Sequence, residues 1–348
     1  MKRRLFLRAF GGAAAGMTVG LPSLARGKQQ VSADLPRRVL GRTGLEASTV
    51  TFPGLALIQG DQAECTAVIH DAVRRGVNYF DVAPAYGKDG ECEIKMGAGL
   101  QGIKRSDYLL ACKTRVRDKE GARKELERSL KRLKTDYFDV YQLHCLMRLD
   151  DVKQAFGPGG AMETLLEAKA EGKVRHLGFS AHTTKAALAA MDQFQFDTVM
   201  FPITFVEYFL MDFGKAVLER AAEQGAAVLG MKMLCRGAWP KDMKRTRPWW
   251  YRCVEDEEEI GLAVRFTLSQ TPVVTGICPS FFDLLDKSIE AGKSYRPITD
   301  EETAHLRGVA QTCESVFRAQ QQNVGGPTCP FSTLYAGNPH ECCPGGHA

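Results

Sequence analysis

The feature that most constrains the fold is a regular alternation of short apolar runs with longer segments of helical pattern, between about residues 45 and 320. Each run is bounded by Gly, Pro, Asp or a charged residue, and short apolar runs with such flanks favour buried parallel strands. The predicted strands are 48–52, 78–82, 108–113, 139–144, 175–180, 198–202, 226–231 and 273–278. Amphipathic helical patterns lie between them, for example at 62–75, 120–134 and 161–172.

The spacing of these strands indicates the architecture. Strand starts lie about 30 residues apart, which is the length of one βαβ unit. Eight such units form a (β/α)8 barrel, whose typical size of about 250 residues matches the repeated region. A doubly wound open sheet is the alternative, but no Gly-rich phosphate-binding fingerprint follows the first predicted strand. We therefore expect an α/β protein in which residues 37–320 form a single-domain TIM barrel.

The first 25 residues have the composition of an export signal. All of their charged residues are basic, namely Lys2, Arg3, Arg4 and Arg8. A mildly apolar, Gly/Ala-rich run follows and ends in the small-residue pattern Ser23-Leu24-Ala25. The paired arginines, followed by x-Phe-Leu-Arg, resemble a twin-arginine (Tat) signal. A membrane anchor is the alternative, but the run is shorter than the roughly 20 apolar residues that span a bilayer.

Residues 1–25 are therefore expected to be cleaved, with the Tat machinery as a partner, giving a periplasmic or otherwise exported protein without a stable membrane span. The whole chain has 46 basic and 41 acidic residues, a formal charge of +5, and removal of the signal leaves 42 against 41. A charge of +1 gives no electrostatic reason to expect nucleic acid as a partner. The composition, 44% hydrophobic and 25% charged, excludes a disordered chain and a multi-span membrane protein.

The 11 cysteines fall into two groups. Eight lie on apolar segments, where a small buried hydrophobic role is expected: Cys65, Cys92, Cys112, Cys145, Cys235, Cys253, Cys278 and Cys313. Cys329, Cys342 and Cys343 lie instead in a Gly/Pro-rich tail, residues 321–348, with His340 and His347 nearby. No zinc, haem or ferredoxin spacing fits this tail. A disulfide between Cys329 and one of the final pair is expected, and a metal or Fe–S site is the less favoured alternative.

Ionisable side chains follow three successive predicted strands. Asp81 ends the second strand and Tyr86 follows it, Lys113 ends the third strand, and His144 ends the fourth. In a barrel, the carboxyl ends of the strands meet at the face that carries the active site, so these four side chains are expected to converge. Together they suit delivery of a proton to a carbonyl oxygen. An ammonium stabilises a neighbouring phenolate, and an imidazole can donate a hydrogen bond to the same oxygen.

Each of these residues also has a structural interpretation. Asp81 could be a helix N-cap, and Lys113 could be a solvated loop charge. Tyr86 could be a packed aromatic with a hydrated hydroxyl group, and His144 could be a core histidine. Their joint position at consecutive strand ends favours the catalytic interpretation.

The sequence around these residues resembles the aldo/keto reductase family. The similar stretches are 78–87 (NYFDVAPAYG), 90–97 (GECEIKMG), 129–144 (SLKRLKTDYFDVYQLH) and 171–180 (EGKVRHLGFS), and the resemblance runs from about residue 37 to 320. It implies that Tyr86 is the general acid, that Lys113 and Asp81 tune it, and that His144 orients the carbonyl. It also implies an NADPH cofactor that lies extended across the barrel mouth. The implied reaction is reduction of an aldehyde or ketone, or oxidation of a sugar or alcohol.

The cofactor-binding part departs from the family pattern. After the fifth strand the family has Ser-Asn, whereas here Ser180 is followed by Ala181, and Met231 replaces the aromatic residue that stacks on the nicotinamide. The residues that the resemblance implies for nucleotide binding are Ser180, Leu234, Arg236, Gly237, Gly276, Ser280 and Lys287. An exported enzyme has no free NADPH pool, so we expect tightly held NADP(H), loaded before transport and recycled by a second substrate.

The segment between the last two predicted strands, 231–273, is longer than the other connections. In a barrel it would lie over the C-terminal face. Trp249, Trp250 and Tyr251, beside Arg247 and Arg252, are candidates for a substrate loop, since such aromatic residues stack on sugars or cap a barrel core. The same residues support the alternative interpretation of the chain. In that interpretation the protein is a non-catalytic exported binding protein for a carbohydrate or a protein partner, built on a degenerate reductase barrel.

Overall fold

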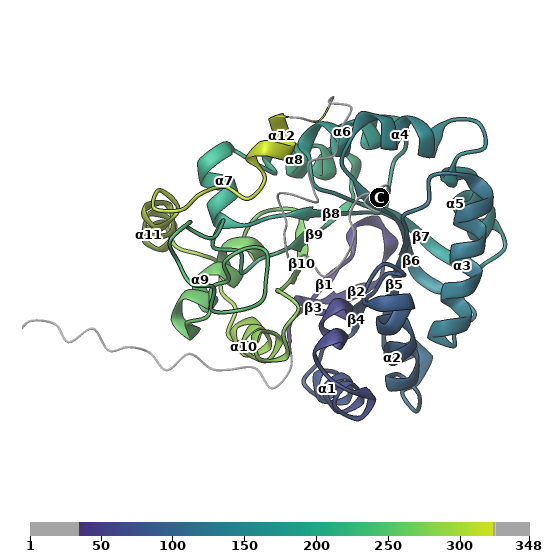
Figure 1. Ribbon diagram of the computed structural model, residues 1–348, viewed down its shortest axis with the longest axis horizontal. Helices are drawn as coiled ribbons and strands as arrows, with labels where there is room; N and C mark the ends of the chain where they lie inside the picture. Colours follow the sequence, from purple (N-terminus) through teal and green to yellow (C-terminus); the bar gives the residue numbers. More distant parts are fainter. Residues whose placement is uncertain (1–34, 323, 325–348) are drawn as a thin grey trace, which may run out of the picture. The chain divides into compact units, whose positions relative to one another are not determined.

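The computed structural model describes residues 35–322 and 324. Within them, parallel strands form a closed barrel in the order β10-β3-β4-β5-β6-β7-β8-β9 (Figure 1). The strands are β3 (Val50–Pro53), β4 (Tyr79–Asp81), β5 (Leu109–Thr114), β6 (Phe138–Leu146), β7 (Val174–Ala181), β8 (Thr198–Pro202), β9 (Ala227–Met231) and β10 (Val273–Ile277). Every neighbouring pair is parallel. The prediction of a (β/α)8 barrel is confirmed, and the open doubly wound sheet is excluded.

A short antiparallel hairpin precedes the barrel, and the sequence pattern did not predict it. It consists of β1 (Arg37–Val39) and β2 (Glu46–Ser48). Its buried residues Leu40 and Ala47 pack with the inward-facing residue Tyr79 at the start of β4. The hairpin therefore covers the amino-terminal end of the barrel, opposite the end where the predicted catalytic residues lie.

The predicted strand 48–52 spans two separate elements, because Ser48 ends the hairpin. The Ser48 backbone N–H donates to Asn78 Oδ1 at 2.7 Å, and its hydroxyl donates to the Val50 carbonyl oxygen at 2.7 Å. These bonds turn the backbone between β2 and β3.

The helices surround the barrel (Figure 1). They are α1 (Gln62–Arg74), α2 (Glu91–Gly99), α3 (Lys119–Leu133), α4 (Leu149–Phe156), α5 (Ala161–Ala170), α6 (Thr184–Gln193), α7 (Phe205–Met211), α8 (Lys215–Gln224), α9 (Glu257–Leu268), α10 (Phe282–Lys293), α11 (Asp300–Ala310) and α12 (Arg318–Gln322). Short 3-10 helices are η1 (Gly41–Thr43), η2 (Gly54–Gln59), η3 (Lys88–Gly90) and η4 (Arg105–Asp107).

Local sequence signals set the ends of the predicted helices. The Asp61 carboxylate accepts from the Glu64 N–H at the start of α1, in a capping box. The Asp118 carboxylate accepts from the Gly121 N–H at the start of α3. Lys134 ends α3 in the left-handed conformation, with a φ of 51°. The three helices predicted from the apolar pattern are therefore confirmed to within one or two residues.

The main apolar core lies between the strands and the helices. Its largest fully buried side chains include Phe52, Phe80, Phe138 and Phe179, each from a different strand. A smaller cluster fills the inside of the barrel, with Tyr79, Val140, Met200 and Leu229 among its members. Both faces of the strands are thus buried, which explains why they read as continuous apolar runs in the sequence.

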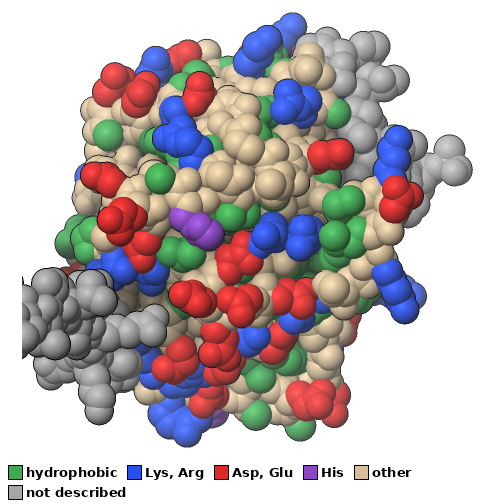
Figure 2. All heavy atoms as spheres, turned by 90° about the vertical axis from the view of Figure 1, so that its left-hand side faces the viewer, with side chains coloured by type: hydrophobic (Ala, Val, Ile, Leu, Met, Phe, Trp, Pro, Cys, Tyr) green, Lys and Arg blue, Asp and Glu red, His purple; other side chains and the backbone are tan. Residues whose placement is uncertain are grey.

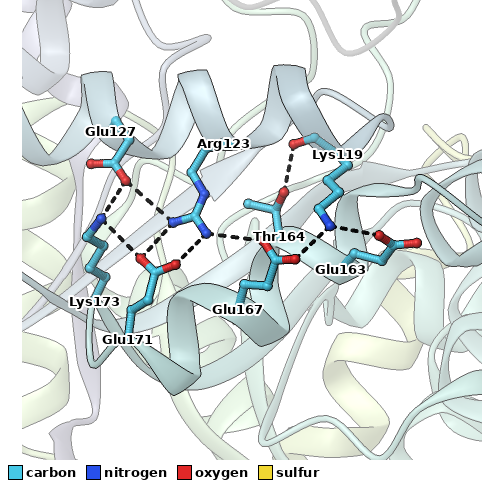
Figure 3. Close-up of polar contacts among 8 residues, drawn as sticks. All are labelled: Lys119, Arg123, Glu127, Glu163, Thr164, Glu167, Glu171 and Lys173. Carbon is cyan, nitrogen blue, oxygen red and sulfur yellow. Dashed lines mark hydrogen bonds and ion pairs between the residues drawn. The ribbon is translucent and has the colours of Figure 1, made fainter.

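An ion-pair network joins α3 to α5 on the outside of the barrel (Figure 3). Arg123 of α3 contacts Glu167 of α5 at 3.2 Å and Glu171 at 2.6 Å. Lys119 contacts Glu167 at 2.6 Å, and Lys173 bridges Glu171 to Glu127. Because these groups are largely exposed, the network orders the two helices without contributing much to overall stability.

The face formed by α9, α10 and α11 carries acidic and basic side chains intermixed (Figure 2). Among the described residues, none of the helices is both long and apolar enough to cross a membrane. The predicted signal, residues 1–25, lies outside the described part of the chain, and so do Cys329, Cys342 and Cys343 of the predicted tail.

Candidate active site

Three neighbouring strands present the predicted catalytic residues at one end of the barrel. Asp81 is the last residue of β4, Lys113 lies near the end of β5, and His144 lies near the end of β6. β4 pairs with β5, and β5 pairs with β6. Tyr86 lies in the loop that leaves β4, held by a hydrogen bond from its backbone N–H to the Ala83 carbonyl oxygen at 3.0 Å. The closed parallel barrel thus brings the four residues to its carboxyl-terminal mouth, as the sequence predicts.

Asp81 and Lys113 form a buried ion pair. The side chain of Lys113 is fully buried, and its Nζ donates to both carboxylate oxygens of Asp81, at 2.5 Å for Oδ2. Nζ also donates to the Val82 carbonyl oxygen at 3.3 Å, and Gln142 Nε2 donates to Asp81 Oδ1 at 3.4 Å. Burial raises the pKa of Asp81, and the Lys113 ammonium opposes this rise. Lys113 is therefore not a solvated loop charge, and the Asp81 carboxylate holds an ammonium rather than capping a helix.

Tyr86 connects this ion pair to His144. Lys113 Nζ lies 5.2 Å from the centre of the Tyr86 ring. The rings of Tyr86 and His144 lie 5.7 Å apart in an edge-to-face arrangement, with an interplanar angle of 83°. The ring of Tyr86 is half-buried, whereas Asp81 and His144 are buried. A partly exposed phenol ring therefore lies within about 6 Å of both the buried Lys113 ammonium and the His144 ring.

A pocket opens beside Tyr86. It is lined by Pro53, Gly54, Leu55, Asp81, Tyr86, Met200, Met231, Lys232, Trp249, Trp250, Tyr251, Ile277, Cys278, Pro279 and Ser280. Residues from β3, β4, β8, β9 and β10 contribute to it, so it lies over the carboxyl ends of the strands. An apolar, concave lining with a few convergent polar groups is typical of a small-molecule site.

The aromatic residues of the long insertion form one wall of this pocket. Trp250 and Tyr251 pack edge to face at 4.6 Å, and Trp249 packs against Phe281 at 5.2 Å. Trp239 Nε1 donates to the Trp249 carbonyl oxygen at 2.8 Å. All three predicted substrate-loop residues are buried, at no more than 7% exposure. The insertion therefore covers the C-terminal face as expected, and its aromatic side chains cap the barrel core while they line the pocket.

Lys232 and His182 belong to the same region, and neither was among the predicted site residues. Lys232 follows β9 directly, has a φ of 61° and is 9% exposed. Its Nζ donates to His182 Nε2 at 3.0 Å and lies 5.5 Å from the centre of the Trp250 ring. His182 Nδ1 contacts Cys145 Sγ at 3.5 Å. Lys113 was identified as a charged residue at the end of an apolar run, and Lys232, which directly follows such a run, would be found by a search that includes the next residue.

The predicted nucleotide-binding residues are more dispersed. Ser280 is buried and lines the pocket. Ser180 Oγ accepts from the Cys145 N–H at 2.7 Å, so this hydroxyl supports the backbone that follows His144. Leu234 is fully buried in the apolar core. Gly237 has a φ of 86°, and a Cβ atom built at Gly276 would lie 2.3 Å from Met233 Sδ, so a larger residue is disfavoured at both positions.

The two predicted phosphate-binding cations have protein partners. Arg236 pairs with Glu259 through Nη1, and Lys287 Nζ donates to the Glu255 carbonyl oxygen at 2.8 Å. The Nε of Arg236 is nevertheless buried without a hydrogen-bond partner in the described part of the chain. Of the predicted phosphate-binding residues, Ser280 lines the pocket, whereas Arg236 and Lys287 are not part of its lining. No His, Cys, Asp and Glu cluster suited to a metal occurs in residues 35–322 and 324.

Comparison with known proteins finds relatives of this chain in sequence and in fold. L-galactose dehydrogenase of Arabidopsis thaliana is 34% identical over 191 residues, which are 50% of this chain and 57% of that protein. The 6-dehydroglucose reductase of Novosphingobium aromaticivorans is 30% identical over 173 residues, 45% of this chain and 55% of that protein. The matched part thus spans little more than half the length of each relative.

The fold comparison covers more of the chain. The holo form of aldo-keto reductase AKR11C1 from Bacillus halodurans superposes with a TM-score of 0.65 at 22% identity, over 82% of this chain and 99% of that one. At this identity the match concerns the fold alone. The model of the aldo/keto reductase family matches residues 54–305, which are most of the chain. The protein therefore belongs to the aldo/keto reductase family.

Proposed function

We propose that the protein is an NADP(H)-dependent oxidoreductase that interconverts a carbonyl group and an alcohol on a small polar substrate. The observation that carries this proposal is the convergence of Tyr86 with the Asp81–Lys113 ion pair and His144. We assign each of the four side chains a role in proton delivery, and their contacts place them close to one another. A binding protein would have no use for a fully buried lysine held against a half-buried tyrosine.

In the reductive direction, Tyr86 donates its hydroxyl proton to the carbonyl oxygen of the substrate. The Lys113 ammonium, near the Tyr86 ring, stabilises the phenolate that forms. Asp81 fixes the position of Lys113 and balances its buried charge. His144 orients the carbonyl oxygen by a hydrogen bond. In the oxidative direction, the phenolate of Tyr86 takes the proton back from the alcohol.

NADPH, when bound, supplies the hydride. The residues proposed to hold it are Ser280, Met231 and the aromatic wall of the insertion, which line the pocket, together with Arg236 of the insertion. Lys287 is a further candidate, after exchange of its bond to the Glu255 carbonyl oxygen. The packed Trp249–Tyr251 wall lines the pocket beside Tyr86, and we propose that it limits the access of water once a substrate is bound.

A sugar or sugar-derived compound is the proposed substrate class. Two relatives carry names that refer to sugars, L-galactose dehydrogenase and 6-dehydroglucose reductase. The pocket also combines aromatic surface with the polar groups of Lys232 and Ser280, which suits a compound with an apolar ring face and several hydroxyl groups. We further propose that residues 1–25 direct export by the Tat route and that the nucleotide is loaded before export.

Identification of the bound nucleotide tests this proposal. The purified protein is denatured with acid, and any small molecule that it releases is identified by mass spectrometry. Bound NADP(H), or saturable binding of added NADPH followed by its oxidation with an aldose or keto-sugar, is expected. A protein that neither retains nor binds a nicotinamide nucleotide would contradict the proposed cofactor and reaction.

A further inference from the structure

The long insertion after β9 begins and ends in a two-stranded antiparallel ribbon. The Arg236 N–H donates to the Arg252 carbonyl oxygen at 2.8 Å, and the Val254 N–H donates to the Leu234 carbonyl oxygen at 2.8 Å. Between these bonds, Cys235 and Cys253 are directly paired across the ribbon. Since the hydrogen bonds flank the pair instead of joining it, the two cysteines occupy a non-hydrogen-bonded position.

This position suits a covalent crosslink. Residues opposite each other in a ribbon point to the same face, and in a non-hydrogen-bonded pair their Cα atoms are typically about 4.5 Å apart. Disulfides in proteins join residues with Cα atoms roughly 4.4–6.8 Å apart. Both thiols are free in the structure and both are buried, Cys235 completely and Cys253 to 5% exposure. The backbone pairing thus already brings the two cysteines within the Cα range of a disulfide.

We propose that Cys235 and Cys253 form a cross-strand disulfide that closes the insertion at its base. The two thiols lose two protons and two electrons in total as the S–S bond forms. The electron acceptor is a disulfide, either of a small thiol compound or of another protein, which is reduced to two thiols. This reaction does not depend on the proposed catalytic activity, because none of the proposed proton-transfer residues takes part.

The crosslink would restrain the aromatic wall of the pocket. The loop that it closes, residues 236–252, carries Trp249, Trp250 and Tyr251, which line the pocket beside Tyr86. A covalent bond at the base of this loop limits how far the aromatic wall can move away from the barrel. The aromatic wall should therefore move less in the oxidised protein than in the reduced protein.

The environment of the thiols indicates when the bond forms. Burial raises the pKa of Cys235, and Glu207 and the nearby Cys253 raise it further. Burial also raises the pKa of Cys253. Thiolate is the reactive species in exchange, so both groups react slowly while the ribbon is closed. Oxidation is expected as the chain folds or when the insertion opens transiently.

Cys278 offers a matched comparison. It is a third buried thiol, it lines the pocket beside Trp249 and Trp250, and its thiolate form would contribute to the raised pKa of Cys253. It directly follows β10 and has no partner position in the ribbon. A crosslink directed by backbone pairing should join Cys253 to Cys235, whereas a crosslink between any adjacent thiols could join Cys253 to Cys278.

Peptide mapping distinguishes these outcomes. The full-length protein is incubated with oxidised or reduced glutathione, in buffer and in a urea concentration below the unfolding transition, and free thiols are then alkylated. Trypsin places the three cysteines in separate peptides, 233–236, 253–265 and 266–287. We expect a disulfide-linked pair of peptides 233–236 and 253–265 after oxidation. Alkylation of both cysteines under every condition, or a link between 253–265 and 266–287, would overturn the proposal.

Three variants give an independent readout. In the wild-type protein, oxidation should raise the melting temperature by several degrees and slow proteolysis within residues 236–252. Both effects should vanish in Cys235→Ala and in Cys253→Ala, and both should persist in Cys278→Ala. The mapping of the wild-type protein decides the matter if either alanine variant fails to fold. Equal stability of the oxidised and reduced wild-type protein would contradict the proposed restraint of the aromatic wall.

Discussion

At the residue scale, the central feature is the buried Asp81–Lys113 pair. Lys113 is fully buried, and the energetic cost of burying its ammonium is balanced by the Asp81 carboxylate and the Val82 carbonyl oxygen. Such a pair is not needed for stability, since apolar residues of similar size often stabilise a core equally well. Its position next to the Tyr86 ring is the one that the proposed proton-transfer role requires.

Replacing Lys113 by Met leaves the Asp81 carboxylate buried without its counterion. The free energy of unfolding at neutral pH is expected to fall by about 3–5 kcal/mol. Burial already raises the pKa of Asp81, and loss of the ammonium raises it further. An acid whose pKa is raised by folding binds its proton more tightly in the folded state, so the variant should regain stability as the pH falls.

Urea denaturation at several pH values checks this prediction. The control is Lys124→Met, which removes an exposed lysine of α3 and should change the stability by less than about 0.5 kcal/mol. A Lys113→Met protein as stable as the wild type at neutral pH would show that Lys113 does not compensate the buried carboxylate.

Lys232 gives a second prediction at this scale. Replacing it by Met keeps an apolar stem and removes the ammonium that lines the pocket. If the ammonium holds the substrate equally in the ground state and the transition state, KM should rise about tenfold with little change in kcat, equivalent to about 1.4 kcal/mol of binding. The matched control is Lys241→Met, which changes an exposed lysine of the same insertion. Steady-state kinetics that show kcat falling instead would make Lys232 part of the chemistry.

The residue scale also shows what the sequence could predict about the site. Asp81, Lys113 and His144 were found because each ends an apolar run, and parallel strands bring such ends together. The roles of Arg236 and Lys287 could not be predicted in the same way. They lie on a loop and on a helix, and their partners Glu259 and Glu255 are near them only in the folded chain.

At the element scale, Asp197 joins several secondary-structure elements. Its carboxylate accepts from Arg42 of η1 at 2.9 Å and from the Leu177 N–H of β7 at 2.9 Å. His176 of β7 lies 3.7 Å from the same carboxylate. Burial alone would raise the pKa of Asp197, but bonds from His176, Leu177 and Arg42 hold it well below its usual range.

Replacing Asp197 by Asn tests this junction. A carboxyl whose pKa is lowered by folding stabilises the protein above its unfolded pKa of about 3.9, and this contribution is lost as the pH falls through the folded pKa. Asp197→Asn should therefore cost about 1–2 kcal/mol at neutral pH. The difference from the wild type should shrink as the pH falls below about 4. Urea denaturation at neutral and acidic pH measures it, and a difference that does not vary with pH would exclude a charge effect.

The barrel strands were predictable and the hairpin was not, for a physical reason. The barrel strands are buried on both faces, so their sequences are continuous apolar runs. β1 and β2 have three residues each, and each exposes one or more of its side chains. Strands that short carry too few residues for an alternating pattern to stand out.

At the scale of the whole molecule, the order of the elements places the proposed site at one end of the barrel and the hairpin at the other. The residues proposed to take part in the reaction and the hairpin that covers the core therefore lie at opposite ends of the barrel, as in other barrels of this class. Export is the role proposed for residues 1–25.

Export predicts a clear effect of the paired arginines. Replacing Arg3 and Arg4 together by Lys keeps the charge of the segment and removes the twin-arginine pattern. The variant is expected to accumulate uncleaved in the cytoplasm of a Tat-competent bacterial host, while the wild-type protein is exported. Cell fractionation with detection of a C-terminal tag measures both, and the variant Lys2→Arg serves as a control. Equal export of all three proteins would contradict the Tat route.

The most direct test of the account compares Tyr86→Phe with the wild-type protein. The substitution removes only the hydroxyl that is proposed to donate the proton, and it preserves the ring next to Lys113 and His144. Nucleotide binding is measured by fluorescence titration, and turnover is measured with the same preparation and a reducible sugar. The account predicts nucleotide affinity within about twofold of the wild type and a loss of at least about 100-fold in kcat. Full turnover by Tyr86→Phe would contradict it.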